Sequence, residues 1–198
     1  MSDTSSSSVV KALVPCAWAK GDDYLAYHNN EWGVPNFDRQ KLFEKLCLEG
    51  QQAGLSWITV LRKRDHYRQC FHGFNPQKIA RMADEQIELL LTDTGLIRNR
   101  LKLYGIRKNA LALLALEQQG VDFVEFLWGF VDGQPVINRY ASMKEVPTET
   151  AAAKAMSKAL KKAGFTFVGP TICYAFMQSM GLVNDHMTDC PCHPDNRS

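Results

Sequence analysis

The sequence predicts an all-α protein, and three observations support this prediction. Signals for helix starts and helix ends recur along the whole chain, whereas the alternating pattern of a strand is nearly absent. Of the 198 residues, 45% are hydrophobic and 22% are charged, so the chain can bury a core and is not a disordered segment. We therefore expect a globular protein of roughly eight to ten helices.

The predicted elements follow from residues that commonly begin or end helices. Helix starts are signalled at Asn75-Pro76, Asp84, Asp122, Thr148 or Thr150, and Gly169-Pro170, and helix ends at Gly54, Gly120 and Gly164. Only residues 165–168 (FTFV) alternate well, and this run is short and ends in Gly169-Pro170. Residues 133–147 have no clear period, which indicates a junction, a functional surface or a well-packed irregular connection.

The chain is expected to form one domain. Residues 1–12, which contain a run of four serines, are predicted to be a flexible tail, and residues 13–198 to be a single domain of two helical lobes. The sequence has neither the segments of a signal peptide nor an apolar run that could span a bilayer. We therefore expect no membrane contact, a cytoplasmic location and six reduced cysteines, of which Cys47, Cys70 and Cys173 are expected to be small core residues.

A polar interruption in an apolar helix is the most informative local feature. From Asp38 as the N-cap, apolar residues recur at helical spacing, and Glu49 lies two turns beyond Leu42 at the edge of this apolar stripe. Gly54 then marks a turn, Leu55 is an apolar residue at its tip, and Trp57 offers a stacking surface. A buried carboxylate beside an indole is suited to a pocket for a flat cationic ring.

Residues 84–117 are predicted to form a helical hairpin. A short helix over residues 84–92 is followed by a turn with Gly95 and by a long helix that begins at about Arg98. Such a turn brings backbone N–H groups together and can bind a phosphate. The pattern resembles the helix-hairpin-helix element of DNA repair proteins, although any pair of antiparallel helices can have glycine in its turn.

Basic residues form two groups although the net charge is only +2. One group lies within residues 98–108, which contain no acidic residue, and the other within residues 62–68. Each group is either a surface that faces phosphates or the solvated face of a helix, and the sequence alone leaves both interpretations open.

Cysteine and histidine residues near both ends suggest a metal site. Cys16 and His28 lie near the N-terminus, and His186 and Cys190 are four residues apart near the C-terminus. Two cysteines and two histidines are a common ligand set for structural zinc, with no open position for water. Cys192 and His193 are rival ligands, and spacing alone leaves the choice open.

Aromatic residues gather in the first third of the chain, together with Glu49. Their ordinary role is core packing, which we prefer for Trp32. Tyr24 and Tyr27 are three residues apart and would share one face of a short helix. If they are buried, their hydroxyl groups need partners, so a polar pocket is a second interpretation.

Four motifs taken together resemble the bacterial 3-methyladenine DNA glycosylase I family. They are residues 27–35 (YHNNEWGVP), 48–57 (LEGQQAGLSW), 161–169 (KKAGFTFVG) and 181–186 (GLVNDH), and the resemblance extends from about Cys16 to the C-terminal cysteines. It implies a helix-hairpin-helix DNA glycosylase fold whose two ends are joined by one structural Zn²⁺. The ligands that it implies are Cys16, His28, His186 and Cys190.

The resemblance also implies an activity and a set of site residues. The enzyme would flip 3-methyladenine out of double-stranded DNA and hydrolyse its N-glycosidic bond, releasing the free base and leaving an abasic site. Glu49 and Trp57 would contact the base, with Tyr27, Trp18 and Tyr24 lining the pocket. Leu55, Gly54, Gly95 and Arg98 would contact DNA. A monomer in the bacterial cytoplasm, associated with the nucleoid through its DNA, is expected.

The sequence does not identify a residue that would activate the attacking water. The region after the hairpin offers Glu117 and Asp122, and neither can be placed at the sugar from the sequence. Two other functions compete with the glycosylase: a helical DNA-binding module without catalysis, and a zinc-dependent hydrolase, which would need an open coordination position.

Overall fold

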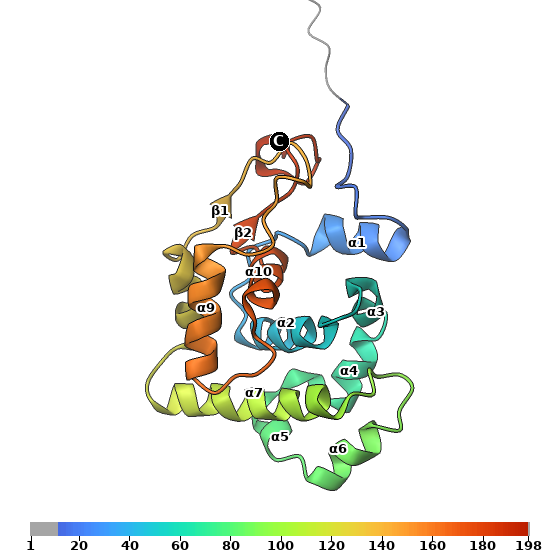
Figure 1. Ribbon diagram of the computed structural model, residues 1–198, viewed down its shortest axis with the longest axis vertical. Helices are drawn as coiled ribbons and strands as arrows, with labels where there is room; N and C mark the ends of the chain where they lie inside the picture. The colour runs from blue at the N-terminus through green and yellow to red at the C-terminus, as the bar shows by residue number, and fades with distance from the viewer. Residues whose placement is uncertain (1–11, 198) are drawn as a thin grey trace, which may run out of the picture.

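The computed structural model describes residues 12–197, so the predicted tail lies outside the described residues except for Ala12. The described chain is mostly helical, as predicted (Figure 1). Its α-helices are α1 (Asp22–Asn30), α2 (Arg39–Gln52), α3 (Trp57–Leu61), α4 (Arg64–Cys70), α5 (Pro76–Ala80), α6 (Asp84–Leu90), α7 (Arg100–Gln118), α8 (Phe123–Trp128), α9 (Ala151–Lys162) and α10 (Pro170–Ser179). Short 3-10 turns are η1 (His72–Phe74), η2 (Gly129–Val131) and η3 (Pro194–Asn196). Among the described residues, no helix is long and apolar enough to cross a membrane.

Helix α2 lies at the centre of the molecule, between α10 and α7 (Figure 1). It begins where the sequence predicts, because the Asp38 carboxylate accepts a hydrogen bond from the backbone N–H of Lys41 at 2.9 Å. Leu42, Phe43 and Leu46 are fully buried on its apolar face. The helix therefore carries its C-terminal residues, including Glu49, into the interior.

The predicted hairpin is present as α6, a turn and α7. Asn99 caps α7 by accepting a hydrogen bond from Lys102 N–H at 3.1 Å. In the turn, the N–H of Gly95 donates to the Asp93 carboxylate at 2.7 Å, and Asp93 also contacts the His66 ring of α4 at 2.7 Å. A Cβ atom on Gly95 would lie 2.4 Å from this ring, so only glycine fits between the turn and α4.

Residues 165–168 do not form a strand, although their alternation is typical of one. No neighbouring strand pairs with them; instead the side chain of Asn109 on α7 replaces one. Its amide oxygen accepts from Thr166 N–H at 2.8 Å and its NH₂ group donates to the Thr166 carbonyl at 3.2 Å. Phe167 adopts a positive φ of 56°, which breaks the extended path.

A two-residue parallel ladder departs from the all-α prediction. Strand β1 (Val136–Ile137) lies within the irregular segment 133–147 and pairs with β2 (Val183–Asn184), with Val136 opposite Val183. The backbone N–H of Thr188 continues this contact by donating to the carbonyl of Tyr140 at 3.0 Å. The segment is thus a junction that holds the C-terminal part of the chain.

The first and last described segments meet at one end of the molecule (Figure 1). The backbone N–H of Val14 donates to the carbonyl of Asp189 at 2.9 Å. Cys16, Met187, Cys190 and Cys192 form a small buried cluster at this contact, separate from the main core. This small cluster therefore holds the first described residues against the C-terminal segment.

Candidate functional site

A cavity of about 240 Å³ lies where α1, α2 and α3 face α10 and the C-terminal segment. Its walls include the five residues predicted to hold a base: Trp18, Tyr24, Tyr27, Glu49 and Trp57. Trp32, which we expected to be a core residue, is buried and also contributes to the wall. The structure thus brings the predicted pocket residues together from three helices and one loop.

Glu49 presents a carboxylate with one free acceptor. The side chain is buried, with 2% of its surface exposed. Its Oε1 atom lies 3.1 Å from the ammonium of Lys45, one turn earlier on α2. Its Oε2 atom is buried and has no hydrogen-bond partner among the described residues. A buried acceptor without a partner is costly to the fold, so it marks a place where a donor from a ligand would be stabilised.

Aromatic residues form much of the remaining wall. The rings of Tyr27 and Trp57 have centroids 5.6 Å apart, and Trp18 contacts Tyr24 edge to face at 5.6 Å. The Tyr24 hydroxyl accepts a hydrogen bond from the N–H of Ile58 at 2.9 Å and so fixes the start of α3, which carries Trp57. Together these side chains offer stacking surfaces for a planar ring, and indole attracts a cation most strongly.

Asp185 is a second buried carboxylate in the cavity wall that sequence reasoning did not single out. It accepts hydrogen bonds from Asn138 at 2.7 Å and from Gln178 at 2.8 Å, and also from the Tyr174 hydroxyl. The residue belongs to the motif 181–186, but its neighbours in the sequence give no hint of these donors. The carboxylate is therefore held in place beside the cavity by two donors from α10 and one from the segment 133–147.

Gly54 and Leu55 lie at an exposed turn between α2 and α3, outside the lining of the cavity. Gly54 has a positive φ of 77°, a conformation that favours glycine. Leu55 is 42% exposed although it is apolar. An apolar side chain held in solvent beside a cavity for a planar ring is suited to insertion into a stack of bases.

Most residues of the two basic groups have an ion-pair or hydrogen-bond partner. Arg100 pairs with Glu88 and Arg107 with Asp84, while the buried ammonium of Lys102 donates to carbonyl oxygens of residues 51 and 53. In the second group, the arginines pair with acidic residues: Arg62 with Asp23, Arg64 with Glu31, and Arg68 with Glu44 and Asp65. Arg98 is exposed, and within the described residues its side chain has no ion pair or hydrogen bond. It is thus available at the hairpin turn for an anion.

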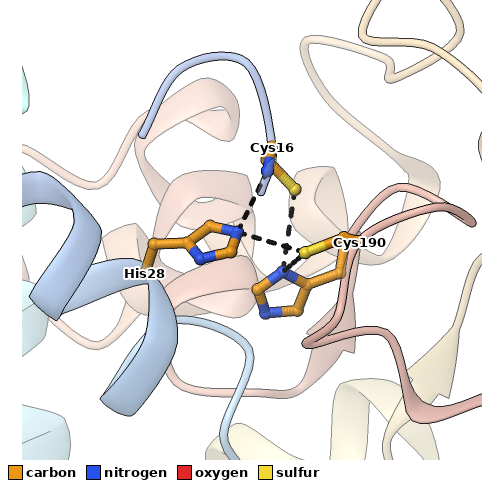
Figure 2. A group of neighbouring side chains, drawn as sticks. Cys16, His28 and Cys190 are labelled. Atoms are coloured by element: carbon orange, nitrogen blue, oxygen red, sulfur yellow. Dashed lines mark hydrogen bonds between the residues drawn. The ribbon is translucent and has the colours of Figure 1, made fainter. Parts of the chain in front are cut away.

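The predicted metal ligands lie together in a buried cluster. The ligand atoms of Cys16, His28, His186 and Cys190 are all within 4.8 Å of one another. The Cys190 sulfur is 3.4 Å from His28 Nε2 and 3.5 Å from His186 Nδ1, and the Cys16 sulfur is 3.7 Å from His186 Nδ1. Figure 2 shows Cys16, His28 and Cys190 pointing toward one another. Two sulfur and two nitrogen donors at this spacing could hold a tetrahedral metal ion.

In each histidine of the cluster, the ring nitrogen that points away from the other ligand atoms has a hydrogen-bond partner. His28 donates through Nδ1 to the side-chain oxygen of Asn29 at 2.8 Å, and His186 donates through Nε2 to the carbonyl of Trp32 at 3.0 Å. These contacts orient each ring so that its other nitrogen faces the cluster, as in a metal site whose histidines are held by outer hydrogen bonds. Hydrogen bonds with Cys16, His186 and His28 lower the pKa of Cys190, which favours its thiolate form.

The rival ligands lie outside the cluster of four. The Cys192 sulfur is nearest to the outer nitrogen of His28, at 3.9 Å, and to the Asn29 side chain, at 3.6 Å. The His193 ring contacts the carbonyl of Asn138 at 3.0 Å. Both residues are buried, and neither belongs to the group of four ligand atoms.

Three other predictions can be compared with the geometry. Glu117 pairs with Arg39, and Asp122 caps α8 by accepting from Glu125 N–H at 2.9 Å, so neither carboxylate reaches the cavity. Cys47 and Cys173 are fully buried, as predicted for core residues. Cys70 is only half-buried and lies 3.5 Å from His66, because α4 turns it toward the hairpin.

The chain is similar in sequence to known methyladenine glycosylases. Residues 18–193 match the family model for methyladenine glycosylase. The chain is 57% identical over 183 residues to DNA-3-methyladenine glycosylase 1 of Escherichia coli strain K12, covering 92% of this chain and 98% of that protein. It is also 57% identical over 178 residues to DNA-3-methyladenine glycosylase of Haemophilus influenzae, covering 89% and 96%.

Solved structures have the same fold. A crystal structure of 3-methyladenine DNA glycosylase I has a TM-score of 0.90 and 60% identity, covering 91% of this chain and all of that chain. A structure of the Staphylococcus aureus enzyme, determined to explain its recognition of 3-methyladenine, has a TM-score of 0.88 and 38% identity, covering 92% of this chain and 98% of that chain.

Proposed function

The chain belongs to the methyladenine glycosylase family, and from this membership and the cavity we propose that it is a DNA repair enzyme that excises 3-methyladenine from DNA. The observation that carries this proposal is the buried Oε2 atom of Glu49, which lacks a partner and belongs to the wall that also contains Trp57. Such a site favours a planar, cationic ring with an amino group.

Recognition of the base is assigned to the cavity wall. Methylation at N3 gives the adenine of a nucleotide a positive charge. We propose that Glu49 accepts a hydrogen bond from the amino group of this base and that Trp57 stacks on its face, with Tyr27, Trp18 and Tyr24 forming the remaining surface. An unmethylated adenine has no such charge, so it gains less from the carboxylate and the indole.

The reaction breaks the bond between N9 of the base and C1′ of the sugar. The electron pair of this bond leaves with the base, which becomes neutral, while positive charge develops on the sugar. Water adds to C1′ and loses a proton, giving an abasic site and free 3-methyladenine. A methylated base is already a good leaving group, so the enzyme contributes mainly recognition and orientation. Nearby phosphates and the carboxylate of Asp185 would stabilise the charged sugar.

The base must leave the duplex before it can enter the cavity, which costs a few kcal/mol of stacking and pairing. We propose that Leu55, supported by the Gly54 turn, fills the vacated space. The α6–α7 hairpin is proposed to act as a helix-hairpin-helix element, with Gly95 and Arg98 at the DNA backbone. All of these residues come from one chain, so a single copy is proposed to be active.

We further propose that Cys16, His28, His186 and Cys190 hold one Zn²⁺ with a structural role. Four protein donors leave no open position, which argues against a zinc-dependent hydrolase. When bound, the ion would join the two ends of the domain and would supply no group to the reaction. The cavity, in turn, argues against a DNA-binding module without catalysis, because such a module has no use for a buried acceptor without a partner.

The proposed function is tested by base release. Duplex DNA treated with a methylating agent is incubated with the protein, and the released bases are separated and identified. We expect free 3-methyladenine, and we expect Glu49→Gln to release it about 10- to 100-fold more slowly, because a charge-assisted hydrogen bond contributes roughly 1.5–3 kcal/mol. If the wild-type protein releases no methylated base from DNA that it binds, the proposal is wrong.

A further inference from the structure

Lys45 places a positive charge inside the core, beneath the proposed base site. It lies on α2 one turn before Glu49, and only 7% of its surface is exposed. Its Nζ atom is 2.7 Å from the hydroxyl oxygen of Tyr27, 3.1 Å from Glu49 Oε1 and 3.3 Å from the centroid of the Trp57 ring. One ammonium group therefore contacts three of the residues assigned to base recognition.

Lys45 contacts these residues from outside the cavity. Tyr27, Glu49 and Trp57 line the cavity, whereas Lys45 lines a separate depression of about 800 Å³ between α1, α2 and α4. Tyr27 belongs to both walls. The lysine thus supports the recognition residues from the opposite side and leaves the cavity free.

Burying the ammonium of a lysine costs hydration free energy, so a lysine at this position needs an explanation. Burial disfavours the charged form and lowers the pKa of Lys45 to about 8, although the carboxylate of Glu49 acts in the opposite direction. An apolar side chain of similar length would fill the same space without the loss of hydration. Packing alone does not account for a charged residue here.

We propose that Lys45 is a positioning residue that keeps Glu49 ionised and holds its Oε1 atom, so that Oε2 is presented to the amino group of the base. This inference rests on the proposed function. A carboxylate buried without a counter-charge takes up a proton and becomes a poor acceptor. With the ammonium bound to Oε1, the carboxylate stays charged and cannot rotate freely.

The pH dependence follows from the charges that surround the ammonium. Glu49 on α2 and Glu31, which follows α1, favour its charged form, while Arg64 on α4 disfavours it. Burial raises the pKa of Tyr27, whose hydroxyl therefore remains protonated as Lys45 titrates. Lys45 is protonated below a pH of about 8 and loses its charge above it. Excision should accordingly decline above this pH, because Glu49 then loses its counter-charge.

The test compares excision rates under single-turnover conditions, from about pH 6 to about pH 9.5, for four proteins. The wild type is compared with Lys45→Met, Lys45→Arg and the control Lys41→Met, whose lysine is exposed one turn earlier on α2. Lys45→Met should be about 10- to 100-fold slower at neutral pH. Lys45→Arg should recover part of the neutral rate without the decline near pH 8, because arginine does not titrate there. Lys41→Met should follow the wild type.

A double variant keeps the test decisive if Lys45→Met is unstable. Lys45→Met combined with Glu49→Gln removes both charges, and its excision rate should equal that of Glu49→Gln alone, because Lys45 acts through Glu49. Additive losses would overturn the inference, as would a wild-type rate and pH profile in folded Lys45→Met. Failure of the wild type to release any base would instead refute the proposed function.

Discussion

The ammonium of Lys102 donates a hydrogen bond to the carbonyl oxygen of Ala53 at 2.6 Å, which connects α7 of the hairpin to the turn that carries Leu55. The same ammonium reaches the carbonyl of Gln51 at 2.8 Å, and the Gln51 side chain donates back to the carbonyl of Lys102 at 3.0 Å. Two surfaces proposed to contact DNA are therefore held at a fixed spacing by one reciprocal contact.

Replacing this lysine should weaken the fold measurably. In Lys102→Met the carbonyl oxygens of residues 51 and 53 lose a charged donor, so we expect the free energy of unfolding to fall by about 1.5–3 kcal/mol. Denaturant unfolding measures this change. Lys108→Met, an exposed lysine on the same helix, should stay within about 0.5 kcal/mol of the wild type. Equal losses in the two variants would contradict the structural role of Lys102.

Truncation of the exposed leucine should affect duplex substrates selectively. Leu55→Gly removes the side chain proposed to fill the gap in the stack, so excision from duplex DNA should fall far more than excision from single-stranded DNA. Rates on the two substrates, measured with the same lesion, give the comparison. Leu13→Gly, which alters another exposed leucine, should change neither rate. Equal losses on both substrates would indicate a packing defect in Leu55→Gly.

Removal of the unpaired arginine should change the salt dependence of DNA binding. In Arg98→Ala one phosphate contact is lost, so the slope of log affinity against log salt should decrease by roughly one unit, for every duplex sequence alike. Titrations at several salt concentrations provide the slope. In Arg139→Ala, where the wild-type guanidinium pairs with Asp195 at 2.9 Å, the slope should be unchanged. A wild-type slope in Arg98→Ala would assign this arginine to the ordinary surface.

The two neighbouring cysteines should respond differently to substitution. Cys190→Ser removes a proposed ligand, so we expect a lower zinc content and a lower melting temperature, because structural metal binding is coupled to folding. Cys192→Ser is the matched control and should retain the metal, since its sulfur lies outside the cluster of four. Metal analysis and thermal unfolding of both variants provide the measurements. Loss of zinc from Cys192→Ser but not from Cys190→Ser would reverse the assignment.

Local sequence signals predicted most helix starts because a cap is a local device. Asp38, Asn75, Asp122 and Thr150 each accept the expected hydrogen bond from a backbone N–H three residues later. Residues 165–168 alternate like a strand but do not form one, and the reason is a contact that is distant in the sequence. Their alternation was real, but the partner of Thr166 is the Asn109 side chain, 57 residues away, and no local pattern encodes that contact.

The candidate site could be predicted only in part for a similar reason. Glu49 and the aromatic residues were found because they stand in recognisable motifs, and the cavity contains them all. Lys45 and Asp185 were missed as site residues. A lysine four residues from a glutamate is ordinarily an exposed helix pair, and only its burial beneath Trp57 makes it unusual. One donor to Asp185, the side chain of Asn138, lies 47 residues away, and no local pattern relates the two residues.

The Cys/His cluster also has a consequence for the timing of protein synthesis. Cys16 and His28 precede or belong to α1 and are synthesised before α2, whereas His186 and Cys190 follow α10 and are synthesised after the hairpin. The ring of His186 packs against Trp32 with centroids 4.7 Å apart, and the ring of His28 packs against Trp18 with centroids 5.2 Å apart. The aromatic wall is therefore completed only when the segments that carry both histidines are present. A nascent chain would therefore display the hairpin before it has a finished cavity. Binding to DNA through the hairpin would then precede base release, which needs the segment that carries His186 and Cys190.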